Sequence, residues 1–252
     1  MKNSGNLWGG HRPAADGKAH DLVPRLNVIT IDGVRGVGKS MLAGSLRDRF
    51  GCGVLDIGPV FRVIAWLFNQ RPTAGEHGAL EALRHELQQG NLKIRMDVGC
   101  GMAASRIELC GESIEQPLWD PSLNQILRRT AGSPAVIAVV KGVARELVSG
   151  ERCVVVGREV GTHFFPEAAL KFLLEAHPGV RRKRKAQQLS MVIPGLEDAR
   201  LTHSEPSRDW NLAQDVIRIE TTLLTPDDLL AKVCRSANVC LGWAEIEASV
   251  YE

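Results

Sequence analysis

The feature that most constrains the fold of this chain is residues 33–40, Gly-Val-Arg-Gly-Val-Gly-Lys-Ser, which match the pattern G-x-x-x-x-G-K-[ST] without a mismatch. The preceding residues 26–31 form a short apolar run rich in β-branched side chains, which predicts a buried strand. Apolar residues then recur on one face over 39–50 and Gly51 supplies a C-terminal stop, so a helix is predicted there. A strand, a glycine loop and a helix in this order are the context that a phosphate-binding loop requires.

The chemistry of this loop indicates a nucleoside triphosphate. Glycines let backbone N–H groups converge on phosphate oxygens, and the start of the following helix adds the positive end of its dipole. Lys39 is expected to reach the β- and γ-phosphates, and the Ser40 hydroxyl to ligate Mg²⁺. A dinucleotide site is disfavoured because G-x-G-x-x-G is absent. The predicted ligands are therefore ATP and Mg²⁺, and the predicted nucleotide-binding residues are Gly33, Gly36, Val37, Gly38, Lys39 and Ser40.

Composition excludes several function classes. Of the 252 residues, 44% are hydrophobic and 24% are charged, which rules out disorder, collagen and a membrane bundle as descriptions of the whole chain. A formal net charge of +2 is too small to indicate nucleic-acid binding by bulk charge. The six cysteines form no C-x-x-C pair, so a zinc or thioredoxin-type site has no support. We expect a cytoplasmic protein with no membrane or nucleic-acid partner, acting as a monomer or homodimer.

The pattern along the chain predicts one large domain. Residues 1–25 are expected to be a flexible leader, 26–235 the main domain and 236–252 a C-terminal tail, with a surface-packed or docking helix over 241–250. Strands alternating with helices predict a parallel sheet covered on both faces. Residues 71–112 differ, because their strand-like runs alternate between apolar and polar side chains, and we interpret them as a small inserted module.

A phosphate-binding loop leaves open a small-molecule kinase, a GTPase switch and an ATPase motor. The GTPase class is disfavoured because no element like N-K-x-D or D-x-x-G lies in a suitable place. Far downstream, residues 181–185 place five cations together, an arrangement that like-charge repulsion disfavours without a polyanion nearby. A lid of this kind suits a kinase that must exclude water from its site. A solvated basic face or a weak nucleic-acid patch is the alternative interpretation of this run.

Further segments, in order, are similar to the motifs of one family. These are residues 29–33, 55–62, 157–166 and 215–222. On these residues the chain resembles the cytidylate kinases over roughly 26–235. The resemblance implies an α/β P-loop NTPase fold, in which a parallel β-sheet is flanked by helices. It also implies an acceptor-binding module at 71–112 and a basic lid at about 178–210.

The resemblance implies ATP-dependent transfer of the γ-phosphoryl group to a pyrimidine nucleoside monophosphate, CMP or dCMP. By position in the motifs, Arg181 and Arg184 of the lid grip ATP and neutralise the moving phosphoryl group. Together with Arg158 and Lys39 they are the predicted catalytic residues.

The same resemblance implies an acceptor pocket. Arg62 is expected to contact the acceptor phosphate, since a guanidinium fork suits a phosphate dianion. Arg158 and Glu159 are expected to line the pocket, and a mutual surface ion pair is the alternative. Asp56 is either a pocket residue or a helix cap, with equal support for each.

This acceptor half departs from the pattern of the family. Ile57, Phe61, Ile137 and Val156 replace a hydroxyl residue, a tyrosine, an arginine and an acidic residue, respectively, and Glu159 replaces an aspartate. A lost phosphate-binding arginine removes charge-assisted hydrogen bonds that contribute about 1.5–3 kcal/mol each. Three interpretations therefore stay open: a diverged CMP or dCMP kinase, a kinase for another small molecule, and a non-catalytic nucleotide-binding protein. The intact phosphate loop disfavours the last.

Overall fold

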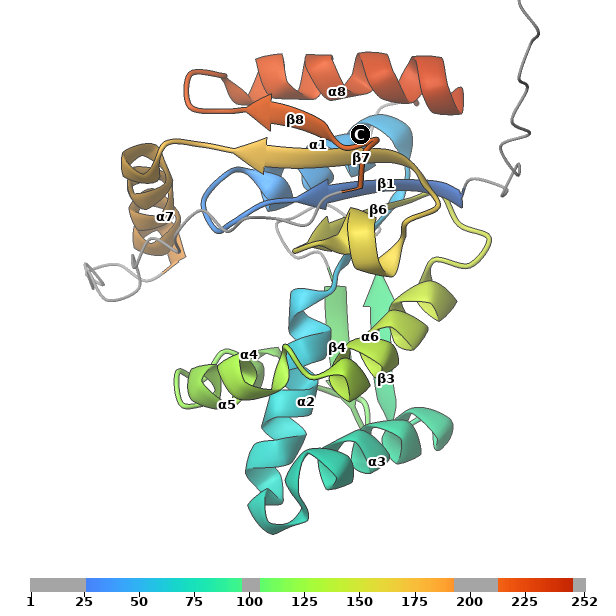
Figure 1. Ribbon diagram of the computed structural model, residues 1–252, viewed down its shortest axis with the longest axis vertical. Helices are drawn as coiled ribbons and strands as arrows, with labels where there is room; N and C mark the ends of the chain where they lie inside the picture. Colours follow the sequence, from blue (N-terminus) through green and yellow to red (C-terminus); the bar gives the residue numbers. More distant parts are fainter. Residues whose placement is uncertain (1–25, 97–104, 193–212, 247–252) are drawn as a thin grey trace, which may run out of the picture.

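The computed structural model describes residues 26–96, 105–192 and 213–246. Figure 1 shows two parts, a parallel sheet with its covering helices and a lower group of helices with a small antiparallel sheet. The first part is made of β1 (Leu26–Asp32), α1 (Lys39–Phe50), β2 (Gly53–Asp56), β6 (Cys153–Gly157), β7 (Ala168–Glu175), α7 (Pro178–Val192), β8 (Ile217–Glu220) and α8 (Pro226–Leu241). The expected leader and the expected lid after residue 192 lie outside the described residues.

The large sheet has the strand order β2-β6-β1-β7-β8, and every pair in it is parallel. β1 is the central strand and its residues 28–32 are all buried. A strand covered on both faces is predominantly apolar, which is why the run at 26–31 identified it. The predicted fold class, an α/β fold with a parallel sheet flanked by helices, is confirmed.

Two apolar clusters lie on opposite faces of this sheet. On one face, Ile29 and Ile31 of β1 pack in the same cluster as Leu46 of α1 and Val233 of α8. On the other face, Val28 belongs to the cluster formed with α2, α3, α6 and the antiparallel strands. Alternate residues of β1 thus pack against the elements on the two opposite faces of the sheet.

The second part begins where α2 leaves the sheet (Figure 1). Its short strands pair antiparallel in the order β3-β4-β5. In β3 the buried Leu92 and Ile94 alternate with the exposed Lys93 and Arg95, as the sequence pattern predicts. The boundaries 71–112 of an inserted module stay a prediction. The elements are α2 (Gly58–Gln70), η1 (Pro72–Ala74), α3 (Gly75–Gln88), β3 (Leu92–Met96), β4 (Ser105–Leu109), β5 (Glu112–Ser113), α4 (Glu115–Leu118), α5 (Leu123–Thr130) and α6 (Pro134–Leu147).

The expectation of a helix over 241–250 is wrong for its described part. The last helix is α8, which ends at Leu241 because Gly242 adopts the left-handed conformation, with φ at 62°. The expected boundary of a tail at 236 thus falls inside α8. Residues 242–246 continue without helical structure, and 247–252 lie outside the described residues. None of the helices in the described ranges is long and apolar enough to cross a membrane.

The segment 242–246 forms a strap, which we define by these residues, across the end of α1. Trp243 is 1% exposed, meets the ring of Phe50 edge-on at 5.5 Å, and donates through Nε1 to the Asn27 side chain. The Ile246 N–H donates to the Arg49 carbonyl at 2.9 Å. The strap therefore joins the C-terminus of the described chain to α1 and to the first strand.

We expect Trp243→Ala to lower the free energy of unfolding by about 3–5 kcal/mol, the range found when a buried large aromatic side chain is removed. Urea unfolding followed by circular dichroism measures the change. Ile246→Ala, in the same strap but at a side chain 53% exposed, is the control and is expected to change stability by less than about 1 kcal/mol. Equal effects of the two substitutions would contradict this account of the strap.

Candidate active site at the carboxyl edge of the parallel sheet

Three neighbouring strands end at the same edge of the sheet. Pairing of Asp56 with Val156, and of Asp32 with Gly157, brings the ends of β2, β6 and β1 level. The phosphate loop follows β1, α2 follows β2, and the Arg158–Glu159 turn follows β6. Ligands of open parallel sheets bind beyond such carboxyl ends. The fold therefore brings the motifs at 33–40, 55–62 and 157–166 together.

Three glycines give the phosphate loop its path. Gly33, Gly36 and Gly38 have φ of 148°, 83° and 107°, values that other residues rarely adopt. A Cβ on Gly33 would lie 2.6 Å from the Leu174 carbonyl oxygen, and one on Gly36 would lie 2.7 Å from the Arg181 carbonyl oxygen. Both glycines are thus required by backbone conformation and by the close approach of neighbouring backbone.

The Lys39 ammonium reaches back across this loop from the first position of α1. Its Nζ donates to the carbonyl oxygens of Gly33 at 2.6 Å and of Val34 at 3.0 Å. The Ser40 hydroxyl lies exposed in the same first turn of the helix. Hydroxyl oxygen is a hard donor of the kind Mg²⁺ accepts, so the donor chemistry fits the predicted ligand.

Asp32 is a site residue that the sequence reasoning missed. Its carboxylate is 1% exposed and accepts the N–H groups of Val160 at 2.7 Å and Gly161 at 2.9 Å. Burial raises the pKa of this carboxyl, while the two N–H donors act in the opposite direction. These bonds tie η2 (Val160–Phe164), and with it the turn at 158–159, to the start of the phosphate loop. An acidic residue ending a buried strand was the available signal.

The turn after β6 is held in a strained conformation. Glu159 has φ 55° and ψ 26°, the left-handed region that costs a residue with a side chain of order 1–3 kcal/mol. Its carboxylate lies 3.7 Å from Nε2 of His163, and Arg158 beside it is exposed. Such strain persists where surrounding contacts fix it, here the Asp32 bonds to the next two residues.

Arg62 is a buried cation whose hydrogen-bond partners are neutral. It is 5% exposed, donates to the Leu118 carbonyl at 3.0 Å and to Oδ1 of Asn124 at 3.2 Å, and lies 4.2 Å from the Trp119 ring centroid. Within the described part of the chain, no carboxylate lies at ion-pair distance from it. Burial, together with nearby Arg35, lowers its pKa to about 10, so the guanidinium stays charged at neutral pH. A desolvated cation of this kind is prepared to receive an anion.

Asp56 acts at the start of α2. Its Oδ1 accepts the N–H of Gly58, the first residue of α2, at 2.9 Å, although the N-cap position itself is Ile57. Burial raises the pKa of this carboxyl, and Lys39, Arg35 and Arg62 act in the opposite direction. The Asp56 carboxylate is therefore attracted by cations of both the phosphate loop and α2.

Helix α7 carries the basic run and lies next to the phosphate loop (Figure 1), with the Arg181 backbone close to Gly36. Arg181 is 7% exposed, whereas Arg182 and Lys183 are exposed, so the run does not form one solvated face. Arg184 donates to the Thr221 hydroxyl at 3.1 Å and to the Thr221 carbonyl at 2.7 Å. Thr221, which sequence reasoning also missed, lies 3.1 Å through its hydroxyl from the Val37 carbonyl of the loop.

Comparison with known proteins agrees with this geometry. The model of the family described as cytidylate kinase matches residues 29–239. The chain belongs to the cytidylate kinase family. It is 34% identical over 185 residues to the cytidylate kinase of Nitratidesulfovibrio vulgaris, covering 73% of this chain and 76% of that protein. The cytidylate kinase of Solibacter usitatus is 29% identical over 232 residues, covering 83% of this chain and 92% of that one.

The residues that depart from the pattern of cytidylate kinases are packed into the core of this family member. Ile57 is 3% and Val156 1% exposed, and Phe61 meets the ring of Phe164 edge-on at 6.2 Å. Ile137 of α6 is partly buried against the same apolar cluster as Ile57, whereas Val156 belongs to the cluster on the opposite face of the sheet.

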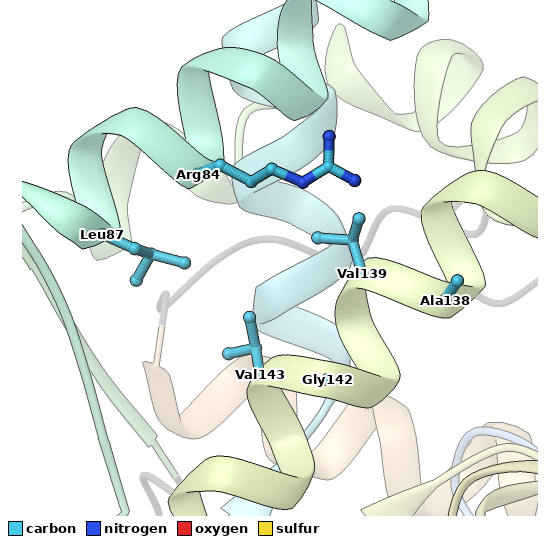
Figure 2. A pocket seen from close by; sticks show the side chains of 6 residues that line it. All are labelled: Arg84, Leu87, Ala138, Val139, Gly142 and Val143. Carbon is cyan, nitrogen blue, oxygen red and sulfur yellow. The ribbon is translucent and has the colours of Figure 1, made fainter.

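A separate groove lies between α3 and α6 (Figure 2). Its volume is about 320 Å³, and its surface is mainly apolar. The guanidinium of Arg84, which pairs with Glu81, is its one charged group. It shares no lining residue with the phosphate loop and presents no convergent polar groups, so it does not compete as the active site. It is lined by Arg84, Leu87, Ala138, Val139, Gly142 and Val143.

We expect Asp56→Asn to gain stability relative to the unsubstituted protein as the pH rises from about 4 to about 7. The raised pKa means that the folded state binds this proton more tightly than the unfolded chain, whose value is near 3.8, so ionisation weakens folding as the pH rises. Asparagine keeps an acceptor for the Gly58 N–H and removes the titration. Urea unfolding at a series of pH values measures the difference.

Asp120→Asn is the matched control. The Ser122 backbone N–H and side chain lower the pKa of the Asp120 carboxyl, so this substitution is expected to show the opposite pH dependence. If the two variants changed in the same direction with pH, the account of Asp56 would be refuted.

Proposed function

We propose that this protein is an ATP- and Mg²⁺-dependent kinase that transfers the γ-phosphoryl group to a pyrimidine nucleoside monophosphate, with CMP or dCMP as the first candidates. The observation that carries the proposal is the placement of a complete phosphate loop beside Arg62, a buried cation with only neutral partners. One feature suits a triphosphate donor and the other a phosphate-bearing acceptor. Membership of the cytidylate kinase family supports the same pairing.

In the donor half, the N–H groups of residues 36–38 and the Lys39 ammonium bind phosphate oxygens, which replace the carbonyl contacts that Lys39 now makes. Ser40 holds Mg²⁺, which supplies charge neutralisation on the phosphate oxygens. Arg181 and Arg184 approach from α7 and stabilise the charge on the transferring group. Arg184 must exchange at least one of its Thr221 contacts to do so.

In the acceptor half, Arg62 of α2 and Arg158, which follows β6, bind the acceptor phosphate. Glu159, held by its strained turn, and Asp56 accept hydrogen bonds from the pyrimidine nucleoside. Binding between buried walls excludes water, which would otherwise compete as the acceptor of the phosphoryl group.

A second candidate is a kinase with the same donor half and a different small-molecule acceptor. The apolar packing of Ile57 and Ile137 in one cluster favours it, because it leaves fewer polar groups to bind a nucleotide. A coupled assay of ADP release with ATP and Mg²⁺ across CMP, dCMP, UMP, AMP and GMP separates the candidates. The first is supported if CMP or dCMP is preferred, and it is refuted if none of the five stimulates ADP release.

Lys39→Ala is expected to lower kcat for phosphoryl transfer at least 100-fold, a loss of about 2.7 kcal/mol or more in transition-state stabilisation. The fold should persist, since the ammonium serves the loop rather than the core. Turnover and the unfolding midpoint are measured together. Lys232→Ala, at an exposed position of α8, is the control and should retain turnover. Turnover by Lys39→Ala near that of the control would exclude the assigned role.

Ile137→Arg is expected to raise kcat/KM for CMP by about ten- to a hundred-fold, because it adds one charge-assisted phosphate contact of about 1.5–3 kcal/mol. Ile137 is only partly buried at the N-terminal part of α6, so the longer side chain has an exit from the core. The conservative control is Ile137→Met, which adds no charge and should leave kcat/KM unchanged. A loss of CMP activity in a folded Ile137→Arg protein counts against a CMP-phosphate site there.

A further inference from the structure

Arg35 is a cation of the phosphate loop that the mechanism above does not use. Its side chain is exposed, and it makes no hydrogen bond or ion pair to the residues at 26–96, 105–192 and 213–246. An arginine in such a loop brings a full charge and five donors to a place where glycines and backbone N–H groups suffice for a triphosphate. The Arg35 side chain therefore needs a role other than binding the triphosphate.

The surrounding loop directs Arg35 away from the core. Gly36, the next residue, lies so close to the Arg181 backbone that no Cβ fits there, and Val37 is fully buried. Lys39 is turned inward to the Gly33 and Val34 carbonyls. Arg35 thus carries the cationic group of the loop that has no internal contact, three residues beyond the end of β1.

The strand register places the acceptor side next to this position. Because Asp32 and Asp56 pair with consecutive residues of β6, the loop after β1 and the start of α2 leave the sheet at one level. Arg35 is close enough to the start of α2 and to α7 to act on three side chains there. It adds to burial in lowering the pKa values of Arg62 and Lys185, and it opposes the larger effect of burial, which raises the pKa of Asp56. Its charge therefore acts between the two helices that flank the site.

Arg35 repels two cations of other elements, Arg62 and Lys185, and it attracts the Asp56 carboxylate. Such a cluster is relieved by a bound anion with more than one negative charge. We propose that Arg35 is a ligand of the acceptor phosphate, supplied by the phosphate loop itself, so that one loop serves both the donor and the acceptor. This assignment rests on the proposed function, since it names a further residue of the same acceptor site.

The test measures KM for CMP and KM for ATP separately in Arg35→Ala. Loss of charge-assisted contacts of about 1.5–3 kcal/mol is expected to raise KM for CMP by about ten- to a hundred-fold, with KM for ATP changed by less than about threefold. Arg35→Lys should recover part of the affinity for CMP. Arg235→Ala, which removes an equally exposed arginine from α8, is the matched control and should leave both constants unchanged.

Two results would overturn the assignment: a rise in KM for ATP alone, which would place Arg35 on the donor, and no change in either constant. If the unsubstituted protein phosphorylates none of the five nucleotides, the proposed function fails, and calorimetric binding of CMP and cytidine then tests Arg35 directly. A preference for CMP over cytidine that Arg35→Ala abolishes supports the phosphate ligand. Absence of that preference, or its persistence in Arg35→Ala, rejects it.

Discussion

The arrangement of the site depends on one buried carboxylate, that of Asp32, which bonds to two backbone N–H groups from a segment 128 residues away in the chain. The central strand ends at this residue, the phosphate loop starts directly after it, and the turn carrying Arg158 and Glu159 is fixed by it. The two N–H donors offset part of the cost of burying this carboxyl group away from water. Donor and acceptor halves are therefore positioned relative to each other by the backbone.

A second connection runs from the phosphate loop to α7. The Arg181 backbone fills the space where a side chain on Gly36 would lie, and Thr221 lies between Arg184 and the Val37 carbonyl. Movement of α7 therefore changes the surroundings of the phosphate loop directly. After α7 the described chain resumes at Ala213, whose N–H is held by the Thr162 hydroxyl, beside the ion pair of buried Lys171 with Asp215. The chain after residue 212 is thus held by η2 and β7.

The sequence predicted those parts of the structure that rest on local patterns. The phosphate loop, the parallel strands and the alternating strands at 92–96 and 105–109 follow from glycine spacing and from periods of apolar residues. Helix α8 and the strap were missed, although Thr225 with Asp228 forms a capping box that marks the start of this helix. Trp243 joins Phe50 and Asn27 only in three dimensions, and no local pattern encodes a contact across 216 residues. The roles of Asp32 and Thr221 were not predicted for the same reason, because their hydrogen-bond partners lie far away in the sequence.

The left-handed conformation of Glu159 has a consequence for how this protein can change. Glycine or asparagine accommodates this backbone more readily than glutamate does. Selection for folding alone would therefore favour glycine or asparagine here, whereas selection for the carboxylate role proposed above would favour glutamate. The residue at position 159 therefore indicates whether selection for folding or selection for the carboxylate is stronger. In related sequences under weaker selection for the reaction, we expect glycine to appear at position 159 before the phosphate loop changes.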